Sequence, residues 1–560
     1  MTQVTDPTGT YQFTFDNMGR LTQATTSYSF LTARNFAASY SYDAASNRTG
    51  FTDPESGATS YAYDTLNRLQ TLTPPSAFSG TSSFGFTYDA LSRRTQMTRP
   101  NGLKSIYAYD NLSRLLSVLH QSGSTTLDGA SYTLDNAGNR TAKTDQLANV
   151  TSNFTYDPIY ELTQVTQATT TTESYSYDAV GNRLSSLGVS SYTNNSSNEL
   201  TSTSNTTYTY DYNGNTLTKV DSTGTTSYVW DFENRLTNVT LPGSGGTVTF
   251  AYDPFGRRIK KVTSSATSIY AFDRDNLIEE TNSSGVVVAR YEQTQNIDEP
   301  LAMLRSSATS YYHADGLGSI SSLSNAAGSI ANTYTYDSFG KLTASTGSLV
   351  NPFRYTARES DTETGLYYYR ARYYDQQTGR FLSEDALGAT SDDLDLYRYV
   401  HNSPAGYTDP SGHRTYNCGP KCGFRLETDP FKGKHINWWC NGLKGCLLFP
   451  SMRPCEESKS DPPPSRLRKC VDDNLPKPKP KSCPKTDFEI QKDIESTQDM
   501  VNFWDWILVG DAAVGAVGVA GALGLLGGGA AGAGGAATAP KPIPFPKPAP
   551  PIPVPVKPAA

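Results

Sequence analysis

The first 417 residues contain no cysteine, and all seven cysteines lie between Cys418 and Cys483. This absence excludes a disulfide framework for most of the chain and indicates that a thiol-rich module begins near residue 418. The opening sequence MTQVTDPTGTYQF has neither a basic start nor an apolar stretch, which excludes a signal peptide in the sequence as it stands. We therefore expect that upstream repeats and any export signal lie outside this chain, or that export uses a route without a cleaved leader.

Aliphatic side chains are also scarce. Hydrophobic residues make up 36% of the chain and the mean hydropathy is -0.50, yet the chain has 36 Tyr and 11% aromatic residues. The surface that stabilises the fold is therefore expected to be aromatic. Charge is uneven as well: up to residue 413 there are 28 Lys and Arg against 40 Asp and Glu, and from Arg414 on there are 19 against 14. The first part is acidic and the tail is basic.

A short pattern recurs fourteen times between Phe13 and Lys341: an aromatic residue, one spacer, usually a second aromatic residue, then Asp, two residues, and Gly, Asn or Ser. The position three before the Asp is aromatic in all fourteen copies, and the position three after it is Gly, Asn or Ser in thirteen, with Tyr160 as the exception. Most steps are 20 to 27 residues, with longer gaps before Asp211 and Asp315. A repeat of this period indicates an array of one small structural unit.

Each copy is predicted to be a β-hairpin. In YAYDTLNRL, Tyr61 and Tyr63 are two residues apart and share one face of a strand. Asp64 and Asn67 bracket the reversal, because an Asp side chain accepts backbone N–H bonds and the later residue tolerates a positive φ. A single hairpin is marginal in water, so neighbouring copies must pair edge to edge and stack their aromatic residues. The predicted fold class is all-β: one long antiparallel sheet that curls into a partial shell.

After the hairpins the pattern changes. The segments YYHADGLGSISSLSNAAG (311–328), NPFRYTARESDTETGLYYYRARYYDQQTGRFLSED (351–385) and LDLYRYVHNSPAGYTDPSG (394–412) follow one another. They resemble the core domain of rearrangement-hotspot (Rhs) proteins, and the hairpin copies resemble the YD repeats that precede that core. The most specific part is the Tyr-rich run with Gly365, Arg370, Arg372 and Gly379. The resemblance covers roughly three-quarters of the chain.

The resemblance implies a shell. In this family the YD sheet spirals into a hollow cocoon, the core closes one end, and a variable C-terminal segment is a toxin or other cargo. Fourteen hairpins supply about 3,500 Å² of wall, whereas a compact tail of the size of residues 414–560 needs about 7,000 Å². Three alternatives follow: upstream repeats are absent from this chain, a partner completes the wall, or the tail is not fully enclosed.

The resemblance also implies a self-cleavage site. Members of the family carry two DPxGL-like motifs and cut themselves after the second, and the corresponding segments here begin at Asp385 and Asp409. Two neighbouring carboxylates cannot both ionise easily, so one holds a proton while the other activates a water molecule. Asp385 and Asp409 are the predicted catalytic pair, and the predicted cut lies between His413 and Arg414.

Two residues depart from the family pattern at this site. Ala386 replaces a Pro, and His413 replaces the apolar residue that usually precedes the cut. The alternative interpretation is that both Asp residues cap turns, as Asp-x-x-Gly segments ordinarily do. For Arg380, just before the first motif, a structural ion pair is favoured over a catalytic role.

The Cys-rich module allows two interpretations. Cys418, Cys422, His435 and Cys440 could bind zinc, which needs four ligands at tetrahedral positions. Disulfides in an exported module would use the same cysteines and leave an odd seventh. We favour disulfides or mixed use, and His435 is expected to be packed beside two tryptophans rather than to act as a nuclease base.

The rest of the tail is low in complexity. Residues 461–486 are rich in Pro, Lys and Arg and are predicted to be an extended linker. From Ala512 to Ala537 there are 26 uncharged residues, enough to cross a bilayer, although glycine recurs every third residue from Gly515 to Gly527 and weakens a helix. A weak membrane-inserting helix and a flexible spacer both remain open. The predicted divisions of the chain are 1–310 (YD repeats), 311–413 (core), 414–460 (Cys-rich module), 461–486 (linker), 487–538 (apolar segment) and 539–560 (Pro-rich tail).

The first hypothesis is an Rhs-type β-shell that encloses or presents a C-terminal effector, in competition between bacteria or in host interaction. Its expected partners are its own tail as cargo, an immunity protein and a secretion apparatus, and its expected location is secreted or on the cell surface. The alternative is an exported structural protein whose Tyr-lined repeats bind carbohydrate or neighbouring cells. A membrane is a further possible partner, nothing points to nucleic acid, and zinc is the one cofactor considered.

Overall fold

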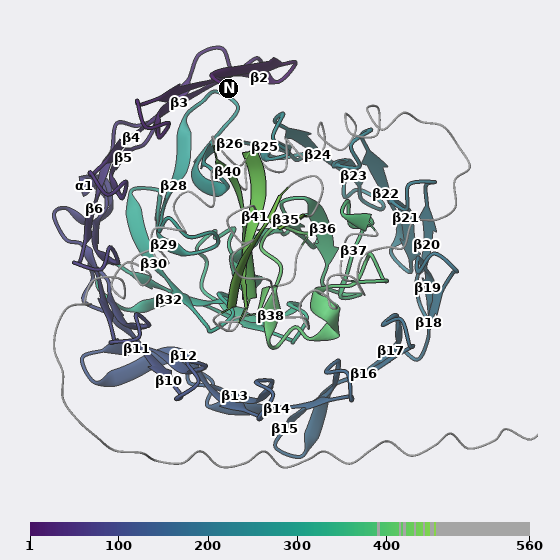
Figure 1. Cartoon of the computed structure of the whole chain (residues 1–560). Coiled ribbons are helices and arrows are strands. Elements are labelled where there is room, and N and C mark those ends of the chain that lie inside the picture. Colours follow the sequence, from purple (N-terminus) through teal and green to yellow (C-terminus); the bar gives the residue numbers. More distant parts are fainter. Residues whose placement is uncertain are drawn as a thin grey trace, which may run out of the picture. The chain divides into compact units, whose positions relative to one another are not determined.

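The repeats form two long antiparallel sheets in which each strand pairs with the strands before and after it in sequence. The computed structural model describes residues 1–388 and 393–413, and beyond them only the backbone of the strands between residues 416 and 454. Figure 1 shows the strands of the first sheet following one another along a curve. The prediction of an all-β fold built from hairpins in a curling sheet is confirmed.

The first sheet has 17 strands: β1 (Gln3–Asp6), β2 (Gly9–Phe15), β3 (Leu21–Tyr28), β4 (Phe36–Tyr42), β5 (Arg48–Thr52), β6 (Ala58–Tyr63), β7 (Leu69–Thr73), β8 (Phe84–Tyr88), β9 (Arg94–Thr98), β10 (Lys104–Tyr109), β11 (Leu115–Ser122), β12 (Thr125–Leu134), β13 (Arg140–Asp145), β14 (Val150–Tyr156), β15 (Leu162–Gln167), β16 (Thr170–Tyr177) and β17 (Arg183–Ser186). A single helical turn, α1 (Ser76–Ser79), interrupts it between β7 and β8.

The second sheet has 16 strands: β18 (Tyr192–Asn194), β19 (Leu200–Thr203), β20 (Thr207–Tyr210), β21 (Thr216–Asp221), β22 (Gly224–Trp230), β23 (Leu236–Thr240), β24 (Thr247–Tyr252), β25 (Arg258–Val262), β26 (Thr267–Asp273), β27 (Asn276–Thr281), β28 (Val287–Gln293), β29 (Pro300–Arg305), β30 (Ala308–Ala314), β31 (Ile320–Asn325), β32 (Ile330–Tyr336) and β33 (Leu342–Thr346). The division expected between residues 310 and 311 falls inside β30, which pairs on both sides.

The hairpin turns have the geometry that the repeat predicts. Asp64 Oδ1 accepts the backbone N–H of Leu66 at 2.9 Å and of Arg68 at 3.0 Å, and Asn67 has a φ of 57°. The third residue after the Asp has a positive φ in thirteen of the fourteen copies, including Tyr160 at 70°. The exception is the copy at Asp273, whose shorter turn puts the positive φ on Arg274. Tyr160 therefore adopts the conformation of the motif although its residue type departs from it.

Two further hairpins fill the long gaps in the repeat. Before Asp211, Asn195 takes the place of the Asp and accepts the backbone N–H of Ser197 at 2.9 Å, and Asn198 has a φ of 62°. Before Asp315, the turn between β28 and β29 is closed by a bond from Thr294 N–H to Glu299 O. The strands thus continue to form hairpins in the two long gaps where the sequence motif is absent.

Neighbouring hairpins are tied together near their turns. Where a tyrosine stands directly before the Asp, it donates its hydroxyl to a backbone carbonyl of the preceding hairpin, as Tyr63 does to Arg48 O and Tyr88 to Leu69 O, both at 2.8 Å. Where an arginine stands four residues after the Asp, it reaches forward instead: Arg93 Nη1 donates to Asp110 O at 3.0 Å, and its guanidinium lies over the Tyr109 ring. The sequence analysis predicted stacked rings but missed these hydroxyl and guanidinium bonds.

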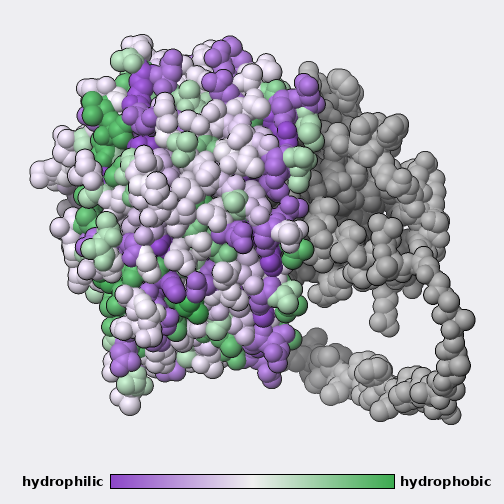
Figure 2. Space-filling view, turned by 90° about the vertical axis from the view of Figure 1, so that its left-hand side faces the viewer, coloured by the Kyte–Doolittle hydropathy of each residue, from purple (hydrophilic) through white to green (hydrophobic). Residues whose placement is uncertain are grey.

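The second sheet returns over one face of the first, so the array is two layers thick there. Buried residues of β2 to β9 pack with residues of β25 to β30, and Phe255 contacts the rings of Tyr11 and Phe13. Polar bonds also cross between the layers, for example from Tyr28 Oη to Tyr270 O at 2.8 Å and from Lys143 Nζ to Asp315 Oδ2 at 2.6 Å. The outer surface over the early strands is mostly pale on the hydropathy scale, with hydrophilic residues along one edge (Figure 2).

The core is a smaller four-stranded sheet that packs on the later part of the array. Its strands are β34 (Glu359–Asp361), β35 (Leu366–Tyr369), β36 (Arg372–Asp375) and β37 (Arg380–Phe381). The turns η1 (Tyr355–Ala357) and η3 (Val400–Asn402) and the short strand β38 (Tyr407–Thr408) complete it. Its tyrosines form one buried cluster with Leu162 and Val165 and another with Val239 and Phe250. The Tyr-rich run is therefore the interior of the core.

Beyond residue 413, β39 (Tyr416–Asn417) pairs with β38. A separate four-stranded meander consists of β40 (Cys422–Asp429), β41 (Gly433–Cys440), β42 (Leu443–Leu448) and β43 (Arg453–Pro454), which the sequence analysis did not predict. Within the part of the chain that the structure describes, no helix has the length and apolar character needed to span a bilayer. The candidate membrane segment 512–537, the linker and the Pro-rich tail lie outside the described residues.

Candidate self-cleavage site

Asp385 and Asp409 lie in two turns that meet at the start of β36. Asp385 follows β37, and its backbone N–H is bonded to Leu396 O at 3.1 Å. Asp409 follows β38 directly. Asp409 lies 24 positions after Asp385 in the sequence, and the structure brings the predicted pair together. Both side chains are buried, with 7% and 4% of their surface exposed.

Arg372 lies between the two carboxylates. Its Nη2 is 3.0 Å from Asp385 Oδ2 and 3.4 Å from Asp409 Oδ2. The rest of the guanidinium is also engaged, because Nη1 donates to Leu396 O at 2.9 Å and Nε donates to Gly412 O. Burial lowers the pKa of Arg372, and the two carboxylates counteract that effect. An arginine nevertheless stays protonated at any ordinary pH, so Arg372 supplies a fixed positive charge.

The bridging arginine changes the expected electrostatics of the pair. The sequence analysis expects two carboxylates that repel each other and share one proton. In the structure, burial acts to raise the pKa of Asp385, but the hydrogen bond from His413 and the charge of Arg372 outweigh it and hold that pKa below its ordinary value. The sequence highlighted Arg372 only as part of the Tyr-rich run, because nothing in its spacing indicates which carboxylates it will face.

Both aspartates also cap turns, as the alternative interpretation predicts. Asp409 Oδ1 accepts the backbone N–H of Gly412 at 2.9 Å and of His413 at 3.1 Å. Asp385 Oδ1 accepts the backbone N–H of Leu387 at 2.9 Å. Turn capping and catalysis do not exclude each other, since in each case the second carboxylate oxygen faces Arg372.

Gly412 sets the path of the chain into the site. Its φ is 77°, and a Cβ added there would lie 2.2 Å from Tyr369 O. Only glycine combines this backbone conformation with so close an approach. The tight passage places His413 beside Asp385, with Nδ1 3.0 Å from Oδ1 and about a quarter of the side chain exposed. The predicted cut follows His413 directly, and Arg414 lies outside the described residues.

Arg380 takes no part in this cluster and forms the structural ion pair that the sequence analysis favoured. Its Nη1 is 3.2 Å from Asp395 Oδ2 and donates to Asn182 Oδ1 at 3.0 Å. The bond to Asn182 ties β37 to the hairpin turn at residues 178–182. The predicted ion pair of Arg380 is present, and its structural role stays a prediction.

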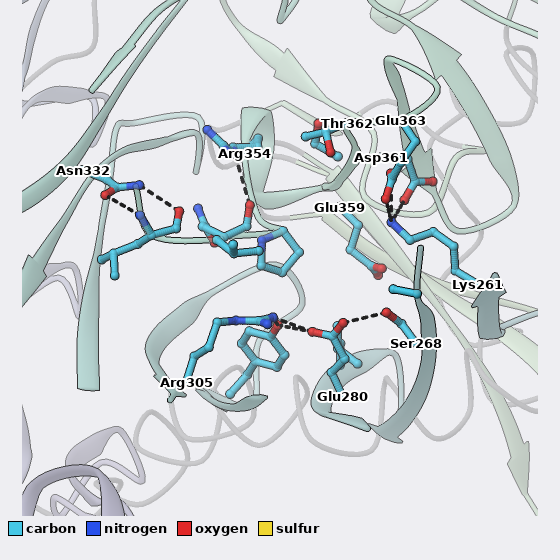
Figure 3. Close-up of a pocket in the computed structure, with 18 of the residues that line it drawn as sticks. Lys261, Ser268, Glu280, Arg305, Asn332, Arg354, Glu359, Asp361, Thr362 and Glu363 are labelled. Carbon is cyan, nitrogen blue, oxygen red and sulfur yellow. Dashed lines mark hydrogen bonds and ion pairs between the residues drawn. The ribbon is translucent and has the colours of Figure 1, made fainter. Parts of the chain in front are cut away.

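A polar cavity of about 360 Å³ lies elsewhere in the core, between β34 and the strands β25 to β33 (Figure 3). Ion pairs line it: Lys261 with Asp361 at 3.1 Å, and Arg305 with Glu280 and the Tyr291 hydroxyl. Neither carboxylate of the candidate site is among its lining residues. The cavity is therefore separate from the predicted chemistry.

The residues named for zinc lie beyond the core. Cys422 on β40 is the register partner of Cys440 on β41, whereas His435 is the partner of Glu427. Five residues of strand separate His435 from Cys440, which corresponds to about 17 Å between their Cα atoms. Cys418 lies outside the described residues. The disulfide and the zinc assignments both remain predictions.

Comparison with known proteins agrees with the fold and with the core. Residues 141–405 match the family model of the Teneurin YD-shell. The crystal structure of TcdB2-TccC3-Cdc42 has the same fold over 74% of this chain and 24% of that chain, with a TM-score of 0.63 and 20% identity. A structure of the Photorhabdus luminescens Tc holotoxin pore superposes over 73% of this chain and 24% of that one, with a TM-score of 0.61 and 19% identity.

Curated relatives are longer proteins. The tRNA nuclease WapA of Bacillus subtilis is 31% identical over 274 residues, which are 46% of this chain and 12% of that protein. Toxin subunit YenC2 of Yersinia entomophaga is 54% identical over 59 residues, 10% of this chain and 6% of that protein. Toxin protein Tse5 of Pseudomonas aeruginosa is 32% identical over 102 residues, 18% of this chain and 8% of that protein. The family match covers a little under half of this chain, and over that part the chain resembles a YD-shell, as its repeats and core indicated.

Proposed function

We propose that this protein presents its C-terminal segment as an effector and releases it by cutting its own chain after His413. The observation that carries the proposal is the meeting of Asp385 and Asp409 on Arg372, directly before the predicted cut. Relatives named as toxins or nucleases support an effector role for the segment beyond the core. The target of that segment, a matching immunity protein and export to the outside of a bacterium belong to the same proposal.

In the proposed reaction, water adds across the peptide bond between His413 and Arg414. One carboxyl takes a proton from the water as its oxygen attacks the His413 carbonyl carbon, and the other donates a proton to the departing Arg414 nitrogen. Arg372 reduces the repulsion between the two carboxylates and favours their close approach. The products are a carboxylate on His413 and a free amine on Arg414.

A denaturing gel tests the cut. The purified full chain should separate into pieces of 413 and 147 residues, and Asp409→Asn should keep it as one band. Asp385→Asn should do the same, because either variant removes one of the two proton carriers. Asp315→Asn is a matched control: Asp315 is also buried and ion-paired, with Lys143 at 2.6 Å, and this pair joins the two layers of the array. One intact band in the unaltered chain, with its folded state verified, would contradict the proposal.

An effector role for the tail needs a separate test. Residues 414–560 are expressed in bacteria, once in the cytoplasm and once directed to the periplasm. A growth defect in either compartment supports a toxin. Normal growth in both favours the alternative of a structural surface protein, for which binding to immobilised glycans by the chain would be measured next.

A further inference from the structure

The residue before the predicted cut is itself bonded to the catalytic pair. His413 Nδ1 lies 3.0 Å from Asp385 Oδ1, and His413 N–H donates to Asp409 Oδ1 at 3.1 Å. An apolar residue at this position could not make the first of these bonds. The chain therefore carries, at the cut, a titratable group that contacts a carboxylate needed for the reaction.

We propose that His413 is a positioning residue that makes self-cleavage depend on pH, holding Asp385 when its imidazole is protonated and freeing it when the imidazole is neutral. The inference rests on the proposed self-cleavage. Ordinary aspartic catalysis is faster in acid. His413 is expected to reverse this pH dependence, so that the chain stays intact in acid and cuts near neutral pH.

The hydrogen bonds that Asp385 accepts explain why protonation of His413 should slow the cut. Its Oδ1 already accepts the N–H of Leu387, and its Oδ2 faces Arg372. The contact from His413 adds a second donor to Oδ1. A charge-assisted bond from an imidazolium is roughly twice as strong as one from a neutral ring. Protonated His413 thus makes Asp385 a weaker base and keeps it from accepting a proton from water.

The charges around His413 come from three elements. Asp385 approaches from the turn after β37, Asp409 from the turn after β38, and Arg372 from β36. Asp393 also acts on Arg372 through space, from the loop before Asp395. Protonation of His413 would place a second positive charge, beside that of Arg372, next to these carboxylates.

A second histidine provides a matched control. His401 Nδ1 is 3.2 Å from Asp393 Oδ2 and the side chain is 40% exposed, so it makes the same type of contact on the same core, away from the cut. His401→Leu should leave the pH dependence of cleavage unchanged. His413→Leu removes the titrating group, and His413→Gln keeps a hydrogen-bond donor that does not titrate.

The experiment measures cutting rates of the full chain. Unfolded chain in denaturant is diluted into buffers between pH 5.5 and 7.5, and timed samples are run on denaturing gels, with resistance to trypsin confirming refolding at each pH. A histidine side chain changes its charge between about pH 5 and 8, so the unaltered chain should cut several-fold more slowly at pH 5.5 than at pH 7.5. His413→Gln and His413→Leu should cut at nearly the same rate at both pH values.

The outcomes separate the two proposals. If the unaltered chain cuts at no pH and resembles Asp409→Asn, the proposed function fails and this inference fails with it. If the chain cuts but both His413 variants keep its pH profile, self-cleavage stands and the role of His413 is overturned. Faster cutting at pH 5.5 in the unaltered chain would overturn it as well.

Discussion

Within the turns of the repeat array many ion pairs join residues four apart and are partly exposed, whereas the pairs that join the array to the core are buried and connect distant segments. Arg93 and Asp89, four residues apart, are each 23% exposed. Arg258 and Asp361 are each 1% exposed and 103 residues apart. The array thus repeats one weak local contact in many turns, whereas the core depends on a few buried contacts, each of which contributes more to stability.

The largest expected effect comes from breaking a core contact. Arg258→Ala removes the partner of Glu359, at 2.8 Å, and of Asp361. An unpaired charge left in the interior costs about 3 to 5 kcal/mol, and Lys261 compensates Asp361 only in part. Urea unfolding of the variant and the unaltered chain measures the difference. A loss below about 1 kcal/mol would mean that the core tolerates substitution as the array does.

Acid should weaken the contact between the two layers. Burial and the charge of Arg99 lower the pKa of His120 to about 4, and burial lowers that of His313 well below its ordinary value. Both rings are neutral in the folded protein but protonate below about pH 6.5 when unfolded. Stability is therefore lost as pH falls from about 6.5 toward 4, and His120 accounts for about 2 kcal/mol of this loss between pH 7 and 5.

Thermal unfolding across that pH range tests whether the contact between the two layers weakens in acid. His120→Gln and His313→Gln should each flatten the pH profile, because a glutamine does not titrate. His401→Gln is the control, since His401 is largely exposed and makes no contact between the layers in the bonds described above. An unchanged slope in both buried variants would assign the acid sensitivity to other groups.

Gly412→Ala should have a smaller effect on stability and a clear effect on cutting. The added Cβ would lie 2.2 Å from Tyr369 O, and the φ of 77° disfavours alanine. Such strain costs about 1 to 3 kcal/mol and would displace His413 from the site. Gly188→Ala is the matched control, with a φ of 83° and no atom within 4 Å of the added carbon. Equal losses in the two variants would show that only φ matters.

The smallest effect is expected in the array. Arg93→Ala removes an exposed pair with Asp89 and one bond to Asp110 O, which together contribute about 1 kcal/mol or less. The same change at Arg68 or Arg114 should cost the same amount, because each turn repeats the geometry. Chemical denaturation of the three single variants measures this. Unequal losses above about 1 kcal/mol would contradict the picture of interchangeable contacts.

The sequence predicts the array well because its determinants are local. An Asp that caps a turn and a third residue that tolerates a positive φ lie in one short segment, so hairpins follow directly from spacing. Even so, the hairpin at Asn195 escaped notice because Asn takes over the role of Asp. The layered return of the second sheet was not predicted, since no spacing indicates which strand faces which across two hundred residues.

The candidate site was predictable only in part. The family resemblance pointed to Asp385 and Asp409, and the structure places both on one arginine. The bridging role of Arg372 and the bond from His413 to Asp385 arise where three separate turns meet. Such contacts depend on the packing of the Tyr-rich core, and composition and spacing carry no signal for them.

The bonds between successive hairpins restrict which insertions and deletions the repeat array can accept. Each aromatic hydroxyl reaches back to the previous copy, and each turn arginine reaches forward to the next, as in Tyr88 to Leu69 O and Arg93 to Asp110 O. Where neighbouring copies carry both the tyrosine and the arginine, removing or duplicating one whole copy leaves both kinds of bond possible at the new junction, whereas a change of a few residues breaks them. These bonds therefore favour changes of chain length by complete hairpin copies.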